Sequence, residues 1–376
     1  MPEILIKKVD NEADKMKFIK FPWKIYKNDP NWVPPLIFDI KSTLNQQKNP
    51  FYKHAKMELY IAYKDGEIAG TIAAIVNKSH NDYYKDKVGF FGFYECINDR
   101  IVSDALYNKA KAFLKENGMD TMRGPVNPST NDTCGFLTDV FDQPPVILMT
   151  YNPRYYLDLA EGYGFYKAKD LLAFMIDKDV INDEKMMAKL QRVSDMVVKK
   201  EGLTIRKVNL SDFKAEVEKV RQVYNNAWQD NWGFVPMTKE EFEYIAGTLK
   251  QAVDKDFVMF AEKDGKVIGF NLALPDLNQA TKVLDGKLLT FKLLKFLQLK
   301  KKIDLLRVII MGVNVEYHKK GIDAVFYLEI IKEGNRKGYR GAEISWVLED
   351  NLPMVQTATK LGAKVYKTYR IYDVGI

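Results

Sequence analysis

Cysteine and histidine are both rare in this chain. Its 376 residues include only two cysteines, Cys96 and Cys134, and three histidines. The two cysteines have no metal-type spacing and cannot form a disulfide framework, and so few histidines argue against a dedicated zinc site. We therefore predict no metal ion and a reducing, cytoplasmic environment.

Long apolar runs are absent as well. The N-terminal segment Met1–Lys8 does not read as a charged region followed by an apolar one, so we expect no secretory signal. No stretch approaches the roughly eighteen apolar residues that a membrane span needs. A strong charge excess is also lacking, because 57 Lys and Arg residues are interspersed with 50 Asp and Glu residues, for a net charge of +7. This balance is compatible with a phosphorylated cofactor or an acidic carrier protein, and it does not indicate DNA binding.

The chain repeats itself. Its length favours two domains, and Lys64–Gly70 matches Lys263–Gly269 at an offset of 199 residues. Four further matches follow the same order at nearly the same offset: Val9 with Val208, Trp32 with Trp232, Asn152 with Asn351, and Gly164 with Gly362. Five weak matches at nearly one offset indicate an internal duplication. We expect domains at 1–180 and 203–376, joined by a helix at 181–202.

Each half shows the same order of expected elements. An Asp-Gly turn at Asp65 and another at Asp264 predict β-hairpins, and a later helix in each half should end at Gly118 and Gly338. Strands interleaved with helices predict an α/β (α+β) fold of two mixed sheets flanked by helices. Two insertions, at about 124–148 and 277–303, distinguish the halves.

A glycine turn follows a strand in the second half. The strand Val313–Val315 leads into Glu316-Tyr317-His318-Lys319-Lys320-Gly321-Ile322-Asp323-Ala324. This order of elements and the spacing His318-x-x-Gly321 resemble the GCN5-related N-acetyltransferases, whose Arg/Gln-x-x-Gly-x-Gly/Ala turn holds the pyrophosphate of coenzyme A. His318 and Asp323 depart from that pattern, and Asp323 is alternatively a helix N-cap.

The resemblance implies a duplicated acyl-CoA N-acyltransferase fold with acetyl-CoA or a longer acyl-CoA as cofactor. The cofactor-binding residues that it implies are Val313, Val315, Lys319, Lys320, Gly321, Ile322, Asp323, Ala324 and Asn351. Backbone amides and small residues in such a turn let the chain approach an anion closely. The two lysines are alternatively ordinary solvated side chains.

The family's general acid is missing from its usual place. In the family, a tyrosine often lies seven residues after the asparagine that Asn351 matches. In this chain that position is Ala358. Tyr366, on the closing strand, is the candidate substitute, with aromatic packing as the alternative. Glu316 and His318 are candidate bases, because an alkyl ammonium must lose a proton before it attacks a thioester. A solvated carboxylate and a phosphate neighbour are their alternative roles.

The first half departs further from the family. Its equivalent turn, Glu95–Arg100, contains no glycine, so we expect a degenerate cofactor turn there. Its insertion carries small polar residues that either line a substrate pocket or cap turns, and its closing segment is the better family match. The substrate-binding residues predicted on these grounds are Asn127, Ser129, Asn131, Asp132, Tyr151 and Asn152. The whole chain is also similar to a group of bacterial N-acetyltransferase-like proteins.

The resulting hypothesis is an acyl-CoA-dependent N-acyltransferase that acts on a small-molecule amine, with an acyl carrier protein as a second candidate partner. Two alternatives remain: a non-catalytic protein that binds acyl-CoA or another small ligand, and a Fem-type transferase that uses aminoacyl-tRNA. Residues 288–306 are both apolar and basic. They are either an inserted core helix, a lid over an acyl chain, or a docking face for an acidic carrier protein or a membrane.

Overall fold

The computed structural model describes residues 3–376 and divides into two compact units. Unit 1 runs through Leu171 and also includes Thr281–Phe296 and Lys367–Ile376, and unit 2 consists of Leu172–Ala280 and Leu297–Tyr366. The division therefore falls near residue 171 rather than at 180, and the expected linking helix belongs to unit 2. The two N-terminal residues of the segment examined for a secretory signal lie outside the described range.

Unit 1 contains a mixed sheet with the strand order β1-β2-β3-β4-β5-β15. The strands are β1 (Ile4–Lys8), β2 (Ala55–Lys64), β3 (Glu67–Asn77), β4 (Val88–Cys96), β5 (Thr121–Gly124) and β15 (Lys364–Gly375). Neighbouring strands are antiparallel except β4 and β5, which are parallel. The predicted hairpin at Asp65 is confirmed, since β2 pairs with β3 and both turn residues have positive φ.

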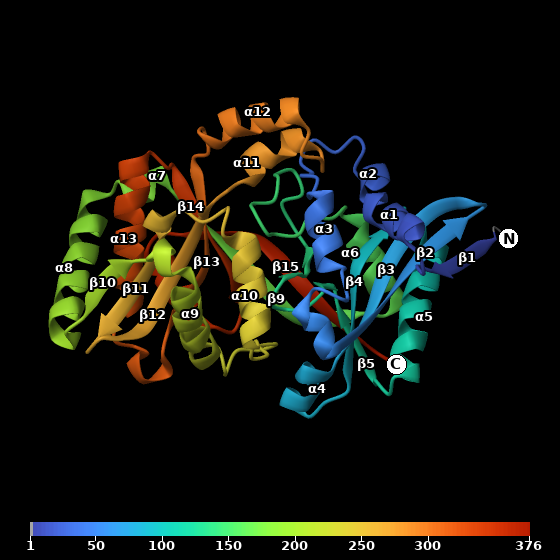
Figure 1. Ribbon diagram of the computed structural model, residues 1–376, viewed down its shortest axis with the longest axis horizontal. Coiled ribbons are helices and arrows are strands. Elements are labelled where there is room, and N and C mark those ends of the chain that lie inside the picture. The colour runs from blue at the N-terminus through green and yellow to red at the C-terminus, as the bar shows by residue number, and fades with distance from the viewer. Residues whose placement is uncertain (1–2) are drawn as a thin grey trace. The chain divides into compact units, whose positions relative to one another are not determined.

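Helices and short strands complete unit 1. They are α1 (Glu12–Lys20), α2 (Pro22–Ile25), α3 (Ile37–Thr43), α4 (Lys78–Tyr84), α5 (Arg100–Glu116), α6 (Tyr155–Tyr163), β6 (Val126–Asn127), β7 (Thr133–Cys134) and β8 (Phe136–Leu137). Helix α5 packs against β1, β2 and β3 (Figure 1). The face predicted from helical spacing is buried there, because Val102, Leu106 and Ala110 are each fully enclosed.

Unit 2 repeats this arrangement with the strand order β9-β14-β13-β12-β11-β10. Its strands are β9 (Tyr166–Asp177), β10 (Thr204–Lys207), β11 (Val258–Lys263), β12 (Lys266–Pro275), β13 (Leu305–Val313) and β14 (Gly341–Leu348). Strands β10 to β13 are antiparallel neighbours, and β13 and β14 are parallel. The second predicted hairpin, at Asp264, joins β11 and β12.

The helices of unit 2 cover two faces of its sheet. They are α7 (Lys178–Ile181), α8 (Glu184–Glu201), α9 (Phe213–Ala227), α10 (Lys239–Leu249), α11 (Asn278–Thr281), α13 (Ile322–Lys337) and α14 (Leu352–Lys360), and α12 (Thr290–Lys300) crosses the division between the units. Helices α8 and α13 lie side by side, and α9 packs with α10 (Figure 1). Leu306 and Val308 of β13 pack toward α13, whereas Ile310 packs toward α9 and α10.

Strands β9 and β15 each contribute residues to both units. The two strands are neighbours, so the strands belong to one thirteen-stranded sheet rather than to the two separate sheets expected. Twelve strands follow one path, and β8 pairs with β15 beside it. The mixed α/β class with flanking helices agrees with the expectation. Among residues 3–376, no helix combines the length and the apolar character needed to cross a bilayer.

Candidate functional site

The parallel strands of unit 2 stop pairing partway along their length. Residues Leu305 to Val308 of β13 pair with Gly341 to Ile344 of β14, and β13 then continues to Val313 without this neighbour. The register of β13 against β12 skips Ile309, so a β-bulge lies where the pairing with β14 ends. A bulge re-aims the strand locally. The edge of β13 from Ile309 onward is therefore not used by β14.

The unpaired end of β13 leads into the glycine turn. A short 3-10 turn at Val315–Tyr317 follows, and α13 begins after Gly321, whose φ is +83°. The backbone N–H groups of Lys319 to Asp323 donate to no protein acceptor within residues 3–376. The first turn of a helix carries such unsatisfied donors and the positive end of the helix dipole. This turn therefore has the geometry of an anion site.

The predicted side chains at this turn are mostly exposed. Glu316, His318, Lys319 and Lys320 are all solvent-facing. The Nε2–H group of His318 donates to the carbonyl oxygen of Val313 at 2.8 Å, which folds the ring back onto the strand end. Lys320 lies 3.1 Å from the Glu201 carboxylate.

Four predicted cofactor residues have other local roles. The N–H of Val315 donates to Asn226 Oδ1 at 2.9 Å, so it is not available to an acyl carbonyl. Gly321 is the N-cap of α13, and the Asp323 carboxylate lies 3.4 Å from Thr357 Oγ1, so the alternative of Asp323 as N-cap is wrong. Asn351 caps α14 by accepting from the N–H of Met354 at 3.3 Å.

The remaining implied residues frame the turn. Val313 pairs with Gly269 of β12, Ile322 is buried under the first turn of α13, and the N–H of Ala324 donates to Gly321. An alanine at Gly321 would adopt a strained φ and place its Cβ 3.1 Å from Val197. The turn thus depends on this glycine for its conformation.

A buried polar cluster lies where β13 and β14 still pair. Arg307 and Glu343 are cross-strand partners, and their charged groups approach to 3.9 Å. Ser345 Oγ and Tyr366 Oη both donate to the Glu343 carboxylate, and Arg307 Nε donates to Ser345 Oγ at 2.9 Å. Glu343 is 0% exposed. Alternation along the strand puts this cluster opposite Leu306 and Val308, and so on the face away from α13.

Tyr366 was predicted from the sequence, whereas Glu343 and Ser345 were not. The available signal was a polar pair two residues apart within the apolar run of β14, which places both side chains on one face of a strand. Six residues of extended strand separate Arg307 from Val313, or about 20 Å. Tyr366 therefore belongs to one end of the unpaired segment, while Glu316 and His318 lie at the other.

The corresponding turn of unit 1 is closed by its own side chain. The Asp99 carboxylate accepts from the N–H groups of Ile101 at 2.9 Å and Val102 at 3.3 Å, and it also pairs with Lys64. A carboxylate that caps the helix neutralises the donors that an anion would need. The N–H groups of Ile101 and Val102 are therefore not available to an anion in this copy.

The space beside β4 is also occupied. Strands β4 and β5 pair only from Val88 to Phe90, which resembles the divergence in unit 2. Here Asn127 Oδ1 accepts from the N–H of Phe93 at 2.6 Å, and a Cβ on Gly92 would lie 1.6 Å from the carbonyl oxygen of Val126. The insertion of unit 1 therefore occupies the edge of β4 that corresponds to the edge of β13 not paired with β14.

The other predicted substrate residues in this insertion bond to one another. Ser129 Oγ donates to Asp132 at 2.7 Å, and the N–H of Asn131 donates to Ser129 Oγ at 3.1 Å. The structure thus places them in the turn-capping arrangement, which was the alternative to a pocket. Asn152 is buried and clamps the backbone of Leu137, accepting from its N–H at 2.7 Å.

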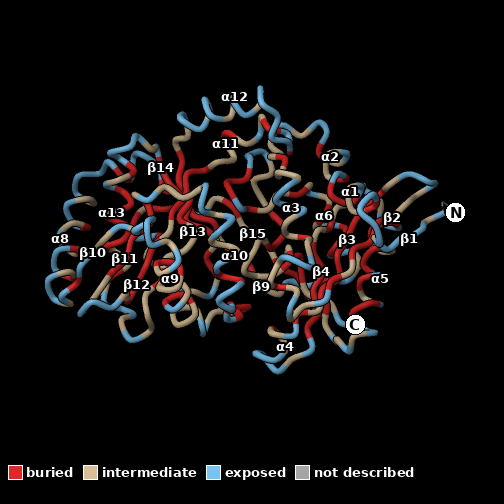
Figure 2. Tube along the Cα trace, viewed as in Figure 1, coloured by how far each residue is buried: buried red, intermediate tan, exposed pale blue. Residues whose placement is uncertain are grey.

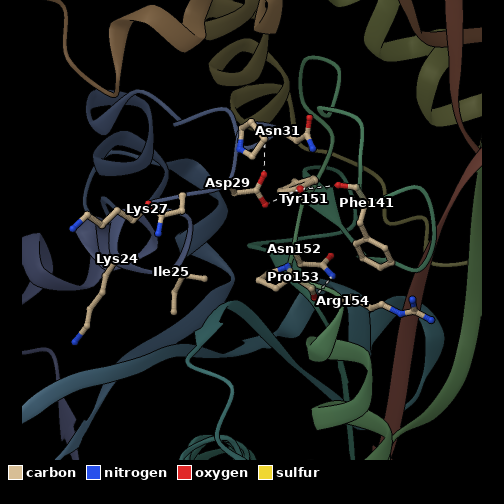
Figure 3. Close-up of a pocket in the computed structure, with 12 residues that line it drawn as sticks. Lys24, Ile25, Lys27, Asp29, Asn31, Phe141, Tyr151, Asn152, Pro153 and Arg154 are labelled. Carbon is tan, nitrogen blue, oxygen red and sulfur yellow. Dashed lines mark hydrogen bonds between the residues drawn. The ribbon is translucent and has the colours of Figure 1, made fainter.

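A pocket of about 510 Å³ opens in unit 1 next to Tyr151 (Figure 3). The Tyr151 hydroxyl lies 2.8 Å from Asp29 and 2.9 Å from the carbonyl oxygen of Phe141. Of the six predicted substrate residues, only Tyr151 and Asn152 line this pocket. The complete lining is Lys24, Ile25, Lys27, Asn28, Asp29, Pro30, Asn31, Phe141, Tyr151, Asn152, Pro153 and Arg154.

Glu95, near the end of β4, is a half-buried carboxyl that we did not single out as functional. Burial raises its pKa to about 7, although the hydroxyl of Tyr156 donates to it at 2.7 Å and so favours the charged form. The equivalent position in unit 2 is Gly312, where a Cβ would lie 2.1 Å from the ring of Trp228. The two copies therefore differ at this position. Within the described residues, no group of three potential metal ligands occurs.

Comparisons with known proteins agree with this architecture. No family model matches the chain. It is 35% identical to the Escherichia coli protein YghO over 98% of this chain and 95% of that protein. It is 33% identical to the bacterial ceramide synthase of Caulobacter vibrioides over 97% of this chain and 96% of that protein.

Solved structures share the fold at low sequence identity. A tandem GNAT protein from the clavulanic acid biosynthesis pathway aligns with a TM-score of 0.58 and 12% identity, over 99% of this chain and 98% of that one. A GCN5-related N-acetyltransferase from Sphaerobacter thermophilus aligns with a TM-score of 0.51 and 12% identity, over 99% and 95% of the two chains. The chain has the tandem GNAT fold.

Proposed function

Because this chain belongs to the family of the Escherichia coli protein YghO and the bacterial ceramide synthase of Caulobacter vibrioides, we propose that it is an acyl-CoA-dependent N-acyltransferase. A ceramide is the amide of a fatty acid and a long-chain amino alcohol. The amine acceptor of this chain is accordingly a long-chain amino alcohol, and the donor is a fatty acyl-CoA.

The observation that carries this proposal is the open turn at the end of β13. Five consecutive backbone N–H groups, from Lys319 to Asp323, have no protein acceptor within residues 3–376, and they follow a strand segment that β14 leaves unpaired. The pyrophosphate of coenzyme A occupies the turn, and its extended arm lies along the free edge of β13. His318 and Lys319 are the side chains that assist there.

The polar cluster at the other end of that segment carries the proton transfers. Because Glu343 is fully buried, it takes the proton of the acceptor's ammonium group through the Tyr366 hydroxyl, which donates to it. The resulting amine attacks the thioester carbonyl carbon. The C–N bond forms and the C–S bond breaks, and Tyr366 supplies the proton that the leaving thiolate needs. The nitrogen loses its second proton in this step, and this proton restores the Tyr366 hydroxyl. Arg307 and Ser345 position Glu343.

Glu316 and His318 lie about 20 Å along the strand from that cluster. We therefore assign them to the cofactor turn rather than to proton transfer. Tyr366 stays the candidate acid. It takes the role of the family's tyrosine, whose position is Ala358 in this chain.

Calorimetric titration with hexadecanoyl-CoA and acetyl-CoA tests the donor site. Gly321→Ala strains the open turn and should weaken acyl-CoA binding by roughly tenfold or more. Gly338→Ala is the matched control, because Gly338 has a φ of +80° at the other end of the same helix and no atom near its absent Cβ. Both variants should lose stability, because each places a side chain at a positive φ. Equal loss of affinity in the two, or no binding by the unaltered chain, contradicts the proposal.

A non-catalytic acyl-CoA-binding protein is the second candidate, favoured by the carboxylate of Asp323 inside the turn and by Ala358 in place of the tyrosine. Release of free thiol from hexadecanoyl-CoA in the presence of sphinganine separates the two. Tyr366→Phe should abolish release while leaving binding intact. Binding without release over a panel of long-chain and short amines favours the second candidate.

A further inference from the structure

Helix α12 exposes large apolar side chains to solvent, and most of its trace is exposed in Figure 2. Phe291, Leu294 and Leu297 are 68%, 61% and 48% exposed. They recur every three residues, so they form one stripe on the helix surface. No residue of α12 is buried. A contiguous apolar surface of this kind marks an interaction site.

The same segment is strongly basic. It carries five exposed lysines, and no acidic residue occurs between Asp285 and Asp304. These lysines are Lys287, Lys295, Lys300, Lys301 and Lys302. The two flanking carboxylates are already engaged, Asp285 with Lys292 and Asp304 with Arg340. In the described part of the chain, no ion pair neutralises the five.

We propose that α12 docks the protein onto the surface of an anionic lipid bilayer. The helix lies in the plane of the interface, with the apolar stripe at the boundary between headgroups and acyl chains. The lysines contact lipid phosphates, and their attraction to the anionic surface adds to apolar burial. An unbroken run of one charge matches a uniformly anionic layer, whereas protein partners usually present mixed charges. Eleven residues of helix span only about 16 Å and do not cross the bilayer.

Vesicle cosedimentation tests this with the full chain. Vesicles of phosphatidylcholine with phosphatidylglycerol should bind it, and vesicles of phosphatidylcholine alone should bind it weakly. The triple variant Phe291→Glu, Leu294→Glu, Leu297→Glu should lower the partition coefficient by roughly a hundredfold. Replacing Lys295, Lys300, Lys301 and Lys302 by Gln should lower binding to anionic vesicles by about tenfold or more and flatten its salt dependence.

The matched control carries the same three charges at exposed apolar positions elsewhere. It is Leu5→Glu, Phe38→Glu, Met196→Glu, at sites that are 58%, 71% and 60% exposed. Its partition coefficient should stay that of the unaltered chain, and circular dichroism should show every variant folded. The proposal is overturned if the unaltered chain does not bind anionic vesicles, or if the control loses as much binding. It is also overturned if an acidic acyl carrier protein binds α12 while vesicles do not.

Discussion

At the scale of single residues, Asp323 is the side chain least suited to the turn around it. Its carboxylate lies in the first turn of α13, where the free backbone amides would meet a pyrophosphate. A negative charge there stabilises the helix but repels a phosphorylated ligand. The same charge therefore has opposite effects on folding and on binding.

Replacing Asp323 with Asn separates these effects. We expect hexadecanoyl-CoA to bind roughly fivefold more tightly, or about 1 kcal/mol, while the free energy of unfolding falls by about 0.5 kcal/mol. Calorimetric titration and urea unfolding measure the two quantities. Glu329→Gln, on the same helix but away from the turn, should leave the affinity unchanged. Weaker binding by Asp323→Asn would show that the carboxylate helps to hold the ligand.

Glu95 makes the stability of unit 1 depend on pH. Burial raises the pKa of this carboxyl from its ordinary 4.5 to about 7, so the folded chain holds the proton more tightly than the unfolded chain does. The stability gained from this proton is full below pH 4.5 and is lost as the pH rises toward 7.

Glu95→Gln removes that dependence. At pH 8 the variant should be more stable than the unaltered chain by roughly 2 kcal/mol, and at pH 4.5 the difference should vanish. Urea unfolding at both pH values measures it. Glu116→Gln, an exposed position at the end of α5, should show no such difference. A variant that is less stable at pH 8 means that the ionised carboxylate is the form that the fold needs.

The residues that sequence reasoning found are those whose role is local. Gly321 was predicted because the spacing His318-x-x-Gly321 after a strand resembles the cofactor turn of the GCN5-related N-acetyltransferases. Glu343 and Ser345 were missed because their importance depends on Arg307 and Tyr366, which come from other strands. A polar residue in an apolar strand gains a role only through partners that the linear order does not reveal. The capping bonds of Ser129 and Asn131 favour the alternative that the sequence had left open.

At the scale of elements, the insertion of unit 1 is held by a buried lysine. Lys367 of β15 is 0% exposed, and its Nζ donates to the carbonyl oxygens of Gln143 and Pro144 at 3.1 and 2.8 Å. Hydrogen bonds from a charged group contribute more to stability than neutral ones. Losing them in the interior also costs free energy, because the buried acceptors are left unsatisfied. The segment around Gln143 and Pro144 is therefore hydrogen-bonded to the closing strand β15.

Lys367→Met keeps the length of the side chain but removes its donors. We expect a loss of about 2–3 kcal/mol in the free energy of unfolding, and faster hydrogen exchange around Phe141. Lys364→Met, at an exposed position on the same strand, should cost less than about 0.5 kcal/mol. Similar stability of the two variants would mean that the insertion is held by other contacts.

Local signals predicted the elements well, because hairpins and helix ends are determined by neighbouring residues. Both Asp-Gly hairpins and the buried face of α5 agree with those signals. The partners of β9 and β15 were not predicted. Each closing strand contributes residues to both units, and strand pairing over such a distance depends on tertiary packing rather than on local propensity.

At the scale of the whole molecule, duplication does not give two equal sites. Unit 2 keeps free amides and an unpaired edge on β13, whereas Asp99 closes the turn of unit 1 and Asn127 occupies the donor on β4. The internal repeat was visible in the sequence. The packing of the unit 1 insertion against β4 was not visible, because it depends on how the insertion folds back onto that strand.

This asymmetry predicts that each chain binds one acyl-CoA. Titration and native mass spectrometry should both give a stoichiometry of one, because only the second turn offers free donors to the pyrophosphate. Lys319→Glu with Gly321→Ala should then remove all binding rather than half of it. Asp99→Ala with Asn127→Ala changes only unit 1, so the affinity of the site in unit 2 should stay unchanged. Two sites in the unaltered chain, or half of the sites left after the change in the second turn, would mean that unit 1 binds the cofactor despite its closed turn.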